Sequence, residues 1–182
     1  RAFIDSRAPP NTVEIIESEY SSDFRDTHMG ELDEQFTAAW YMAALIGHAQ
    51  SKEIAIELFY SGTSNRYGGG FGMWSLEDDS VRLWPVFLAK KIFTSINTPG
   101  STIYETKTEN SLEVLALKSK QGTFLTLVNK ENRQREIPVG FSSRIGSVRD
   151  VKTGATYQVD GDHISFMMQP YEVGFYRLVL DE

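Results

Sequence analysis

The chain has 182 residues, of which 41% are hydrophobic and 24% charged, a composition typical of an ordinary globular protein with room for one domain or slightly more. Its net charge of −7 argues against a nucleic-acid backbone or an anionic membrane as partner. Cysteine is absent, which excludes disulfides, a thiolate nucleophile and a cysteine metal site. No apolar run approaches the roughly 20 residues that a membrane helix needs.

The N-terminal stretch predicts a helix end followed by a buried strand. Residues 1–8 read as the last turns of a helix that Pro9 and Pro10 stop, with no start signal before them, so we expect an N-terminal part of the protein to be missing. Val13–Ser18 predicts a parallel strand covered on both faces. Glu17 and Glu19 follow its apolar run, and carboxylates in such a place are costly unless they are paired or used.

The stretch from residue 31 to the boundary near Pro99 predicts an alternation of helices and strands. Residues 31–51 read as a strong helix with an acidic first turn and apolar side chains at helical spacing. Glu53–Tyr60 predicts a second strand, residues 61–75 a glycine-rich loop, and Pro85 the first position of another helix. This β-α-β-α order is typical of a parallel sheet, in which chemistry sits at the carboxyl ends of the strands. Two such units alone would leave apolar strand edges uncovered.

The pattern changes near Pro99, where we place a domain boundary. Short strand-like runs then recur with Gly, Asn and Asp between them, which predicts an antiparallel sandwich or barrel. Gln121-Gly122 and Asp160-Gly161 are candidate hairpin turns. The predicted strands are Thr102–Lys107, Leu112–Lys118, Thr123–Asn129, Arg135–Val139, Gly146–Val151, Ala155–Val159, Ile164–Met168 and Tyr171–Leu180.

Three segments resemble one enzyme family by their order and spacing. IESEYSS (16–22) resembles the end of barrel strand seven in glycoside hydrolases of the large clan built on a (β/α)8 barrel. DTHMGELDEQFTAAWYMAALI (26–46) resembles the Asp-Thr and Ala-rich helix of the family containing β-xylosidases and α-L-iduronidase. YGGGFGMWS (67–75) is similar to the Gly-Gly-Phe-Gly-Leu segment that follows strand eight there, although Leu-Trp-Pro stands where Lys-Pro usually begins the closing helix.

The resemblance implies an architecture and a site. Residues 1–98 would be the C-terminal portion of a (β/α)8 barrel, with strands seven and eight and their helices, and residues 99–182 a β-sandwich. Glu19 would occupy the nucleophile position, with Glu17 one layer deeper as a structural residue. The resemblance also favours a secreted or periplasmic location.

The chemistry of a retaining glycosidase fits the residue types near Glu19. Such enzymes use two carboxyl groups about 5–5.5 Å apart, one attacking the sugar carbon and the other protonating the leaving oxygen. Tyr20, Tyr60, Phe71 and Trp74 are candidates for contacts with the sugar. In the family the acid/base is a Glu after Asn at the end of strand four, and no Asn-Glu pair occurs here. We therefore expect the acid/base to lie outside this chain, and the chain alone to be inactive.

Other motifs have simpler interpretations. Asp23, Asp26 and His28 share a short loop without the spacing of a known metal motif, so we expect no metal and no cofactor. GGGFG lacks the Gly-Lys-Ser/Thr of a phosphate loop and more simply permits a tight turn. Aromatic side chains of the first helix and of the sandwich are expected in the core, at Phe36, Trp40, Tyr41, Tyr157, Phe166, Tyr171, Phe175 and Tyr176.

Two functions stay open from the sequence. The first is a portion of a retaining glycoside hydrolase, with a carbohydrate substrate and the remainder of the barrel, in the same protein or another chain, as partners. The alternative is a non-catalytic β-sandwich module that binds carbohydrate or stabilises the barrel. A row of exposed aromatic side chains on one sandwich face would favour carbohydrate binding by this module.

Overall fold

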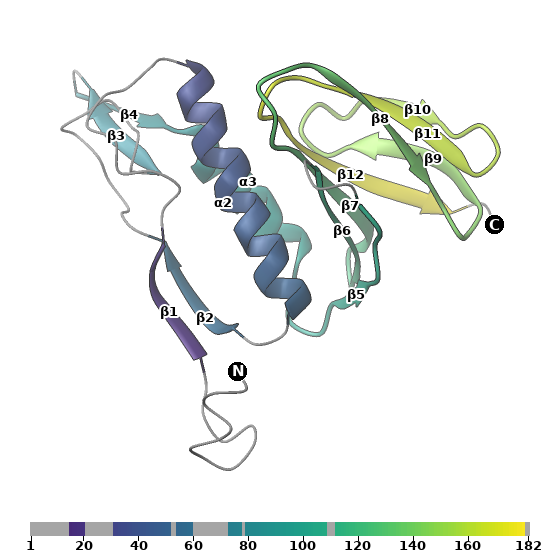
Figure 1. Cartoon of the computed structure of the whole chain (residues 1–182), viewed down its shortest axis with the longest axis horizontal. Helices are drawn as coiled ribbons and strands as arrows, with labels where there is room; N and C mark the ends of the chain where they lie inside the picture. Colours follow the sequence, from purple (N-terminus) through teal and green to yellow (C-terminus); the bar gives the residue numbers. More distant parts are fainter. Residues whose placement is uncertain are drawn as a thin grey trace, which may run out of the picture.

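A computed structural model describes residues 15–20, 31–51, 54–59, 73–77, 79–108 and 112–180. Along the chain, a helix connects the first two described strands, which lie side by side, and a short hairpin, a second helix and a strand-rich region follow (Figure 1). The helix predicted for residues 1–8, the loop with Asp23, Asp26 and His28, and the segment from Tyr60 to Gly72 lie outside the described residues.

The first elements form one parallel β-α-β unit. Strand β1 (Ile15–Tyr20) pairs in parallel with β2 (Ile54–Phe59), and α2 (Glu31–Ser51) connects them. The helix has the predicted bounds, and a helical crossover is how parallel neighbours are usually joined. Strand β1 runs to Tyr20, beyond the predicted end at Ser18, so Glu19 belongs to the strand itself.

A hairpin that the sequence did not predict precedes the second helix. Strands β3 (Trp74–Glu77) and β4 (Ser80–Leu83) pair antiparallel, so the predicted loop over 61–75 is wrong at its end. Asp79 in the turn has a φ of 64°, a left-handed conformation that Asp tolerates better than most residues. Helix α3 (Pro85–Ile96) then starts at Pro85 as predicted, where the missing N–H of proline costs no helical hydrogen bond.

The C-terminal part is an antiparallel sandwich, as predicted. Six strands form one sheet in the order β10-β9-β12-β7-β6-β5, and β11 pairs with β8 in a second sheet. The strands are β5 (Thr102–Tyr104), β6 (Leu112–Ser119), β7 (Gly122–Asn129), β8 (Arg135–Gly140), β9 (Ile145–Asp150), β10 (Thr156–Gln158), β11 (His163–Met168) and β12 (Val173–Leu180). The β6–β7 turn is Lys120-Gln121, one residue before the predicted position, because Ser119 pairs with Gly122.

The six-stranded sheet is buried on both faces by different layers. Along β7, Phe124 and Val128 contact the core formed with the helices, whereas Leu125 and Leu127 contact the core formed with β8 and β11. Alternation of side chains along a strand explains this division. Helices, large sheet and small sheet therefore make three layers (Figure 1), and each fully buried aliphatic or aromatic side chain contributes about 1.5–3 kcal/mol to stability.

One core crosses the predicted domain boundary near Pro99. Buried residues of α2 and α3, such as Ile46 and Phe93, belong to the same cluster as Leu117 of β6 and Phe175 of β12. The division into 1–98 and 99–182 thus separates residues that bury one another. Helices and large sheet depend on the same core for stability.

Candidate functional site

The carboxyl ends of β1 and β2 lie at the same end of the parallel pair. In the register, Glu17 stands opposite Glu57 and Tyr20 opposite Phe59. Glu19 is therefore one residue before the end of β1, beside the end of β2, and β1 belongs to the parallel pair and not to the antiparallel sheet. Because parallel strands run in the same direction, the carboxyl ends of β1 and β2 lie at the same end of the pair. The side chains of Glu19 and Tyr20, and all of Tyr60 and Phe71, lie outside the described part of the chain.

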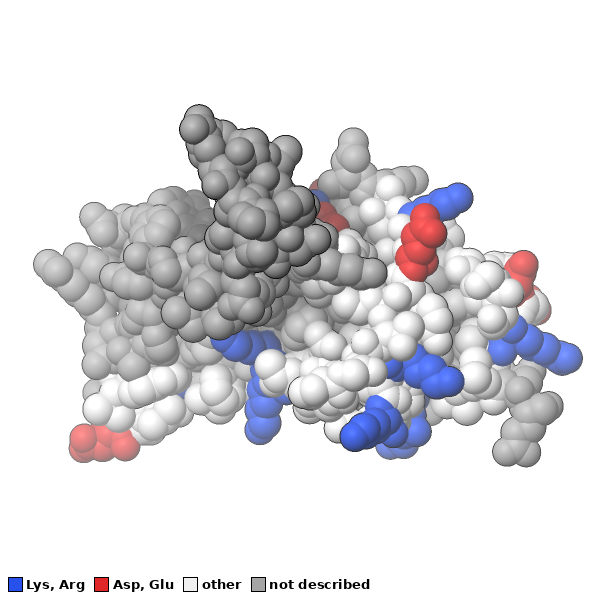
Figure 2. All heavy atoms as spheres, turned by 90° about the horizontal axis from the view of Figure 1, so that it is seen from below, with Lys and Arg blue, Asp and Glu red and all other residues white. Residues whose placement is uncertain are grey.

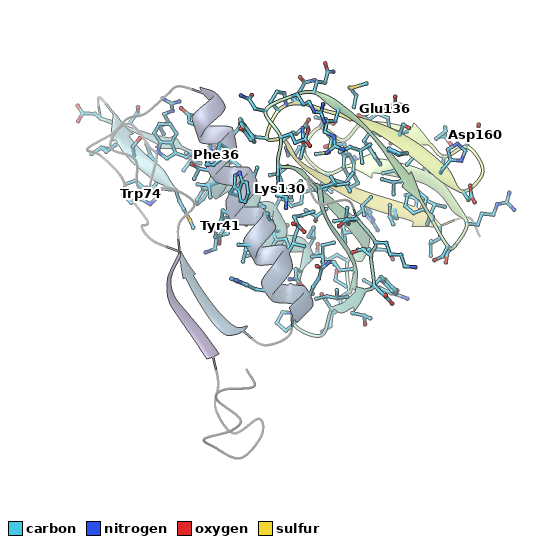
Figure 3. All side chains as sticks on the ribbon, in the orientation of Figure 1. Phe36, Tyr41, Trp74, Lys130, Glu136 and Asp160 are labelled. Atoms are coloured by element: carbon cyan, nitrogen blue, oxygen red, sulfur yellow. The ribbon has the colours of Figure 1, made fainter. Side chains whose placement is uncertain are left out.

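Trp74 is the candidate substrate residue whose side chain the structure describes. It begins β3, opposite Leu83 of β4, and 36% of it is exposed. Figure 3 shows it on the hairpin, far from Asp160 in the sandwich and beyond Phe36 of α2. The hairpin follows β2 in the chain, so Trp74 lies on the segment that leaves the carboxyl end of that strand.

The hairpin is fastened to the start of α2 by a buried carboxylate. Nη2 of Arg82 donates to Oε1 of Glu34 at 2.8 Å, and the Glu34 side chain is almost fully buried. The Arg82 guanidinium also stacks over the ring of Trp84, 4.1 Å from its centre. Trp84 itself is buried, and its backbone N–H donates to the carbonyl of Met73 at 3.0 Å. The acidic first turn of the predicted helix thus supplies the anchor for β4.

A second aromatic group joins α2 to the sandwich. Phe36 contacts Tyr171 edge-to-face at 5.2 Å and Trp40 at 5.9 Å, and the ammonium of Lys130 lies 5.7 Å from the Trp40 ring centre while binding Glu113 at 2.6 Å. Trp40 is 41% exposed, so its predicted place in the core is wrong. The reason is geometric: at about 100° per residue Trp40 lies on the side of α2 that also carries the exposed Gly47, away from the side that buries Ala38, Met42 and Ile46.

The sandwich aromatics do not form an exposed row among the described residues. Phe166, Phe175 and Tyr176 are buried, as predicted. The exposed rings are Tyr104 on β5 and Tyr157 on β10, which are the opposite edge strands of the six-stranded sheet. The predicted place of Tyr157 in the core is therefore wrong. A flat aromatic platform, the feature that would favour a carbohydrate-binding sandwich, is therefore not built by this part of the chain.

The hydroxyl-bearing side chain of Tyr176 is buried in the core of the sandwich. Burial, followed by the nearby carboxylates of Glu172 and Asp150, raises the pKa of its hydroxyl well above the ordinary value. Its ring packs against that of Phe166 with centroids 4.3 Å apart and planes tilted by 36°, and a Cβ at Gly174 would come within 2.6 Å of it. Tyr176 therefore remains neutral and acts as a core residue.

The remaining chemistry of the described residues is limited. They contain no group of three acidic or histidine side chains that could hold a metal ion, and no helix among them is long and apolar enough to cross a membrane. A pocket beside β8, on the sandwich, is lined by residues that include Lys107, Leu112, Arg135 and Pro138. Figure 2 shows basic side chains spread over the described part of one face and separated by uncharged surface, without a single-sign patch.

Comparison of the fold with solved structures finds glycoside hydrolases. The catalytic domain of GH30 xylanase C from Talaromyces cellulolyticus matches 93% of this chain with a TM-score of 0.60 and 14% identity. A GH30 endoxylanase from Clostridium papyrosolvens matches 90% with a TM-score of 0.64 and 11% identity. An arabinose-bound GH51 α-L-arabinofuranosidase matches 99% with a TM-score of 0.67 and 12% identity.

These likenesses define the fold class. The chain has a fold found in glycoside hydrolases, and it spans 42%, 41% and 34% of the three matched chains. No family model matches the sequence, and no curated protein is similar enough in sequence to be matched. The particular family suggested by the sequence motifs is thus not confirmed.

The hairpin that holds Trp74 has a local signal in the sequence that the prediction of a loop did not use. Its signal was present in WSLEDDSVRL, where Trp74 and Leu76 alternate with polar residues before the turn and Val81 and Leu83 do so after it. Two adjacent Asp residues between such runs are typical of a tight turn. The Glu34–Arg82 pair, which joins residues 48 positions apart, has no comparable local signal.

Proposed function

We propose that this chain is a portion of a retaining glycoside hydrolase that cleaves O-glycosidic bonds in a polysaccharide or oligosaccharide. The observation that carries the proposal is the parallel β1-α2-β2 unit with Glu19 next to the carboxyl end of β1, packed beside an antiparallel sandwich. The likeness of this arrangement to glycoside hydrolases supports it. In this proposal residues 1–98 belong to a (β/α)8 barrel and residues 99–182 to the sandwich.

The proposed reaction is a double displacement. The carboxylate of Glu19 attacks the anomeric carbon and forms a glycosyl ester while the bond to the leaving oxygen breaks. An acid outside this chain protonates that oxygen, then removes a proton from the water that cleaves the ester and frees Glu19. Tyr20, Tyr60, Phe71 and Trp74 would contact the sugar. A Glu within a strand loses little further freedom when it is aligned for attack.

The experiment uses the protein encoded by the complete gene and an aryl xyloside or arabinoside as substrate. Glu19→Gln should lower kcat by roughly 10⁴-fold or more, as expected for loss of a nucleophile. Glu17→Gln is the matched control, because it changes a carboxylate of the same strand. An active Glu19→Gln protein, or an equal loss in both variants, contradicts the assignment. The 182 residues alone should show no turnover.

The alternative of a stabilising module has one observation in its favour. The core formed by α2, α3 and the six-stranded sheet is continuous, so the sandwich stabilises the β-α-β part directly. This role is compatible with the enzyme proposal. A sandwich that binds carbohydrate by itself has no such support, since its described exposed rings, Tyr104 and Tyr157, lie on opposite edge strands.

A further inference from the structure

The β3–β4 hairpin has one apolar face that is exposed to solvent. In its register Trp74 stands opposite Leu83, and Leu76 opposite Val81, so these four side chains share a face. Their exposed fractions are 36%, 44%, 55% and 59% in that order. Ser75 and Arg82 form the pair on the other face, where Ser75 is buried and Arg82 binds Glu34.

We propose that this outer face is a docking surface for a neutral oligosaccharide chain, with Trp74 as its aromatic contact and Leu76, Val81 and Leu83 as its apolar floor. The inference rests on the proposed function, and it names the hairpin as the surface that receives sugar units beyond the one at Glu19. The C–H faces of pyranose rings are apolar and pack on indole and aliphatic side chains, while the hydroxyl groups at the ring edges stay in water.

The size of the face favours a sugar over a protein partner. Residues 74 and 76 are about 7 Å apart along the strand, and the two strands are about 5 Å apart. The four side chains expose on the order of a few hundred Å², as functional patches often do. A stable protein interface needs about 800 Å² on each partner, so a second copy of the chain would gain too little here.

The charges around the face favour an uncharged ligand. None of its four side chains is charged, and the cation of this hairpin, Arg82, belongs to the opposite face and is paired with Glu34. Asp79 at the turn is exposed and would repel an acidic sugar. An uncharged xylan or arabinan segment therefore fits better than a polyuronate.

The hairpin is held rigidly enough to bind without reorganisation. The Glu34–Arg82 hydrogen bond of 2.8 Å ties β4 to α2. The stacking of Arg82 on buried Trp84 and the hydrogen bond from Trp84 to Met73 close the base of the hairpin. A surface fixed in this way loses little conformational entropy on binding, which preserves the affinity of a small contact area.

The test measures binding of xylohexaose to the 182-residue chain by titration calorimetry. Leu76→Ser, Val81→Thr and Trp74→Ala change exposed positions, and circular dichroism and thermal unfolding confirm that each variant is folded. Trp74→Ala should weaken binding about tenfold, and Leu76→Ser and Val81→Thr each about threefold. The matched control is Trp40→Ala, which removes the other exposed indole, on α2, and should leave the affinity unchanged.

Several outcomes overturn the inference. They are the absence of binding, affinity that is unchanged in the folded hairpin variants, and self-association of the wild-type chain in analytical ultracentrifugation that Leu76→Ser abolishes. Hydrolysis separates this inference from the proposed function. If the complete gene product cleaves xylan through Glu19 but the hairpin variants retain the wild-type KM, the docking surface is refuted and the enzyme proposal stands. If the chain binds xylohexaose through the hairpin and Glu19→Gln changes no activity, the enzyme proposal fails alone.

Discussion

The shared core predicts that helices and sandwich unfold together. Phe175 of β12 is fully buried in the cluster that contains α2 and α3, on the far side of the predicted boundary from both helices. Phe175→Ala removes most of a buried aromatic side chain and leaves a cavity, which costs about 3–5 kcal/mol. That is a large part of the 5–15 kcal/mol by which a domain is typically stable.

The assay is urea unfolding followed by circular dichroism, with the helical signal and the near-ultraviolet aromatic signal recorded on the same samples. Both signals should show one coincident transition, and Phe175→Ala should shift both to lower urea by the same amount. Val179→Ala is the matched control on the same strand, because Val179 is 45% exposed and its loss should cost less than about 0.5 kcal/mol. A variant whose aromatic transition shifts while its helical transition stays in place would refute the single core.

Two further predictions concern the sandwich. Asn129→Ala should destabilise the fold by about 2–4 kcal/mol in the same assay, because the buried amide donates to the carbonyls of Arg133 and Gln169 and accepts from the N–H of Glu131. Burial raises the pKa of Tyr176, so its contribution to stability is complete below about pH 10 and is lost as the pH rises above that value, by at most about 1.4 kcal/mol per pH unit.

A comparison of variants tests each of these two predictions. An Asn129→Ala protein as stable as the wild type would show that the two turns are held together by other contacts. For the phenol, Tyr176→Phe should flatten the loss of stability between pH 10 and 11, whereas Tyr104→Phe, at an exposed position on β5, should not. Equal slopes in the two variants would contradict the role of burial.

The sequence predicted most elements of the fold because their signals are local. Pro85 predicted the start of α3, because proline fits the first position of a helix. Short strand-like runs with Gly, Asn and Asp between them predicted the strands of the sandwich. The core that joins the helices to the large sheet could not be predicted, because it depends on contacts between segments that are distant in the sequence.

The candidate site divides in the same way. The apolar run before Glu19 placed this residue near the end of a strand. The parallel pairing of β1 with β2 is what a helix connecting the two strands would produce. The ion pair between Arg82 of the hairpin and Glu34 of α2 could not be predicted, because Glu34 has the position of an ordinary acidic residue in a first helical turn. Only the tertiary structure brings it to Arg82.

The most direct test of the account is to trap the glycosyl intermediate. The protein encoded by the complete gene would be incubated with an activated 2-deoxy-2-fluoro-xyloside or arabinoside, which forms the glycosyl ester quickly and releases it slowly, and then digested for mass spectrometry. We expect the sugar on the peptide that contains IESEYSS, with fragmentation assigning it to Glu19. A label on Glu17 or on another peptide, or steady turnover without any labelled carboxylate, would contradict the claim that Glu19 is the nucleophile.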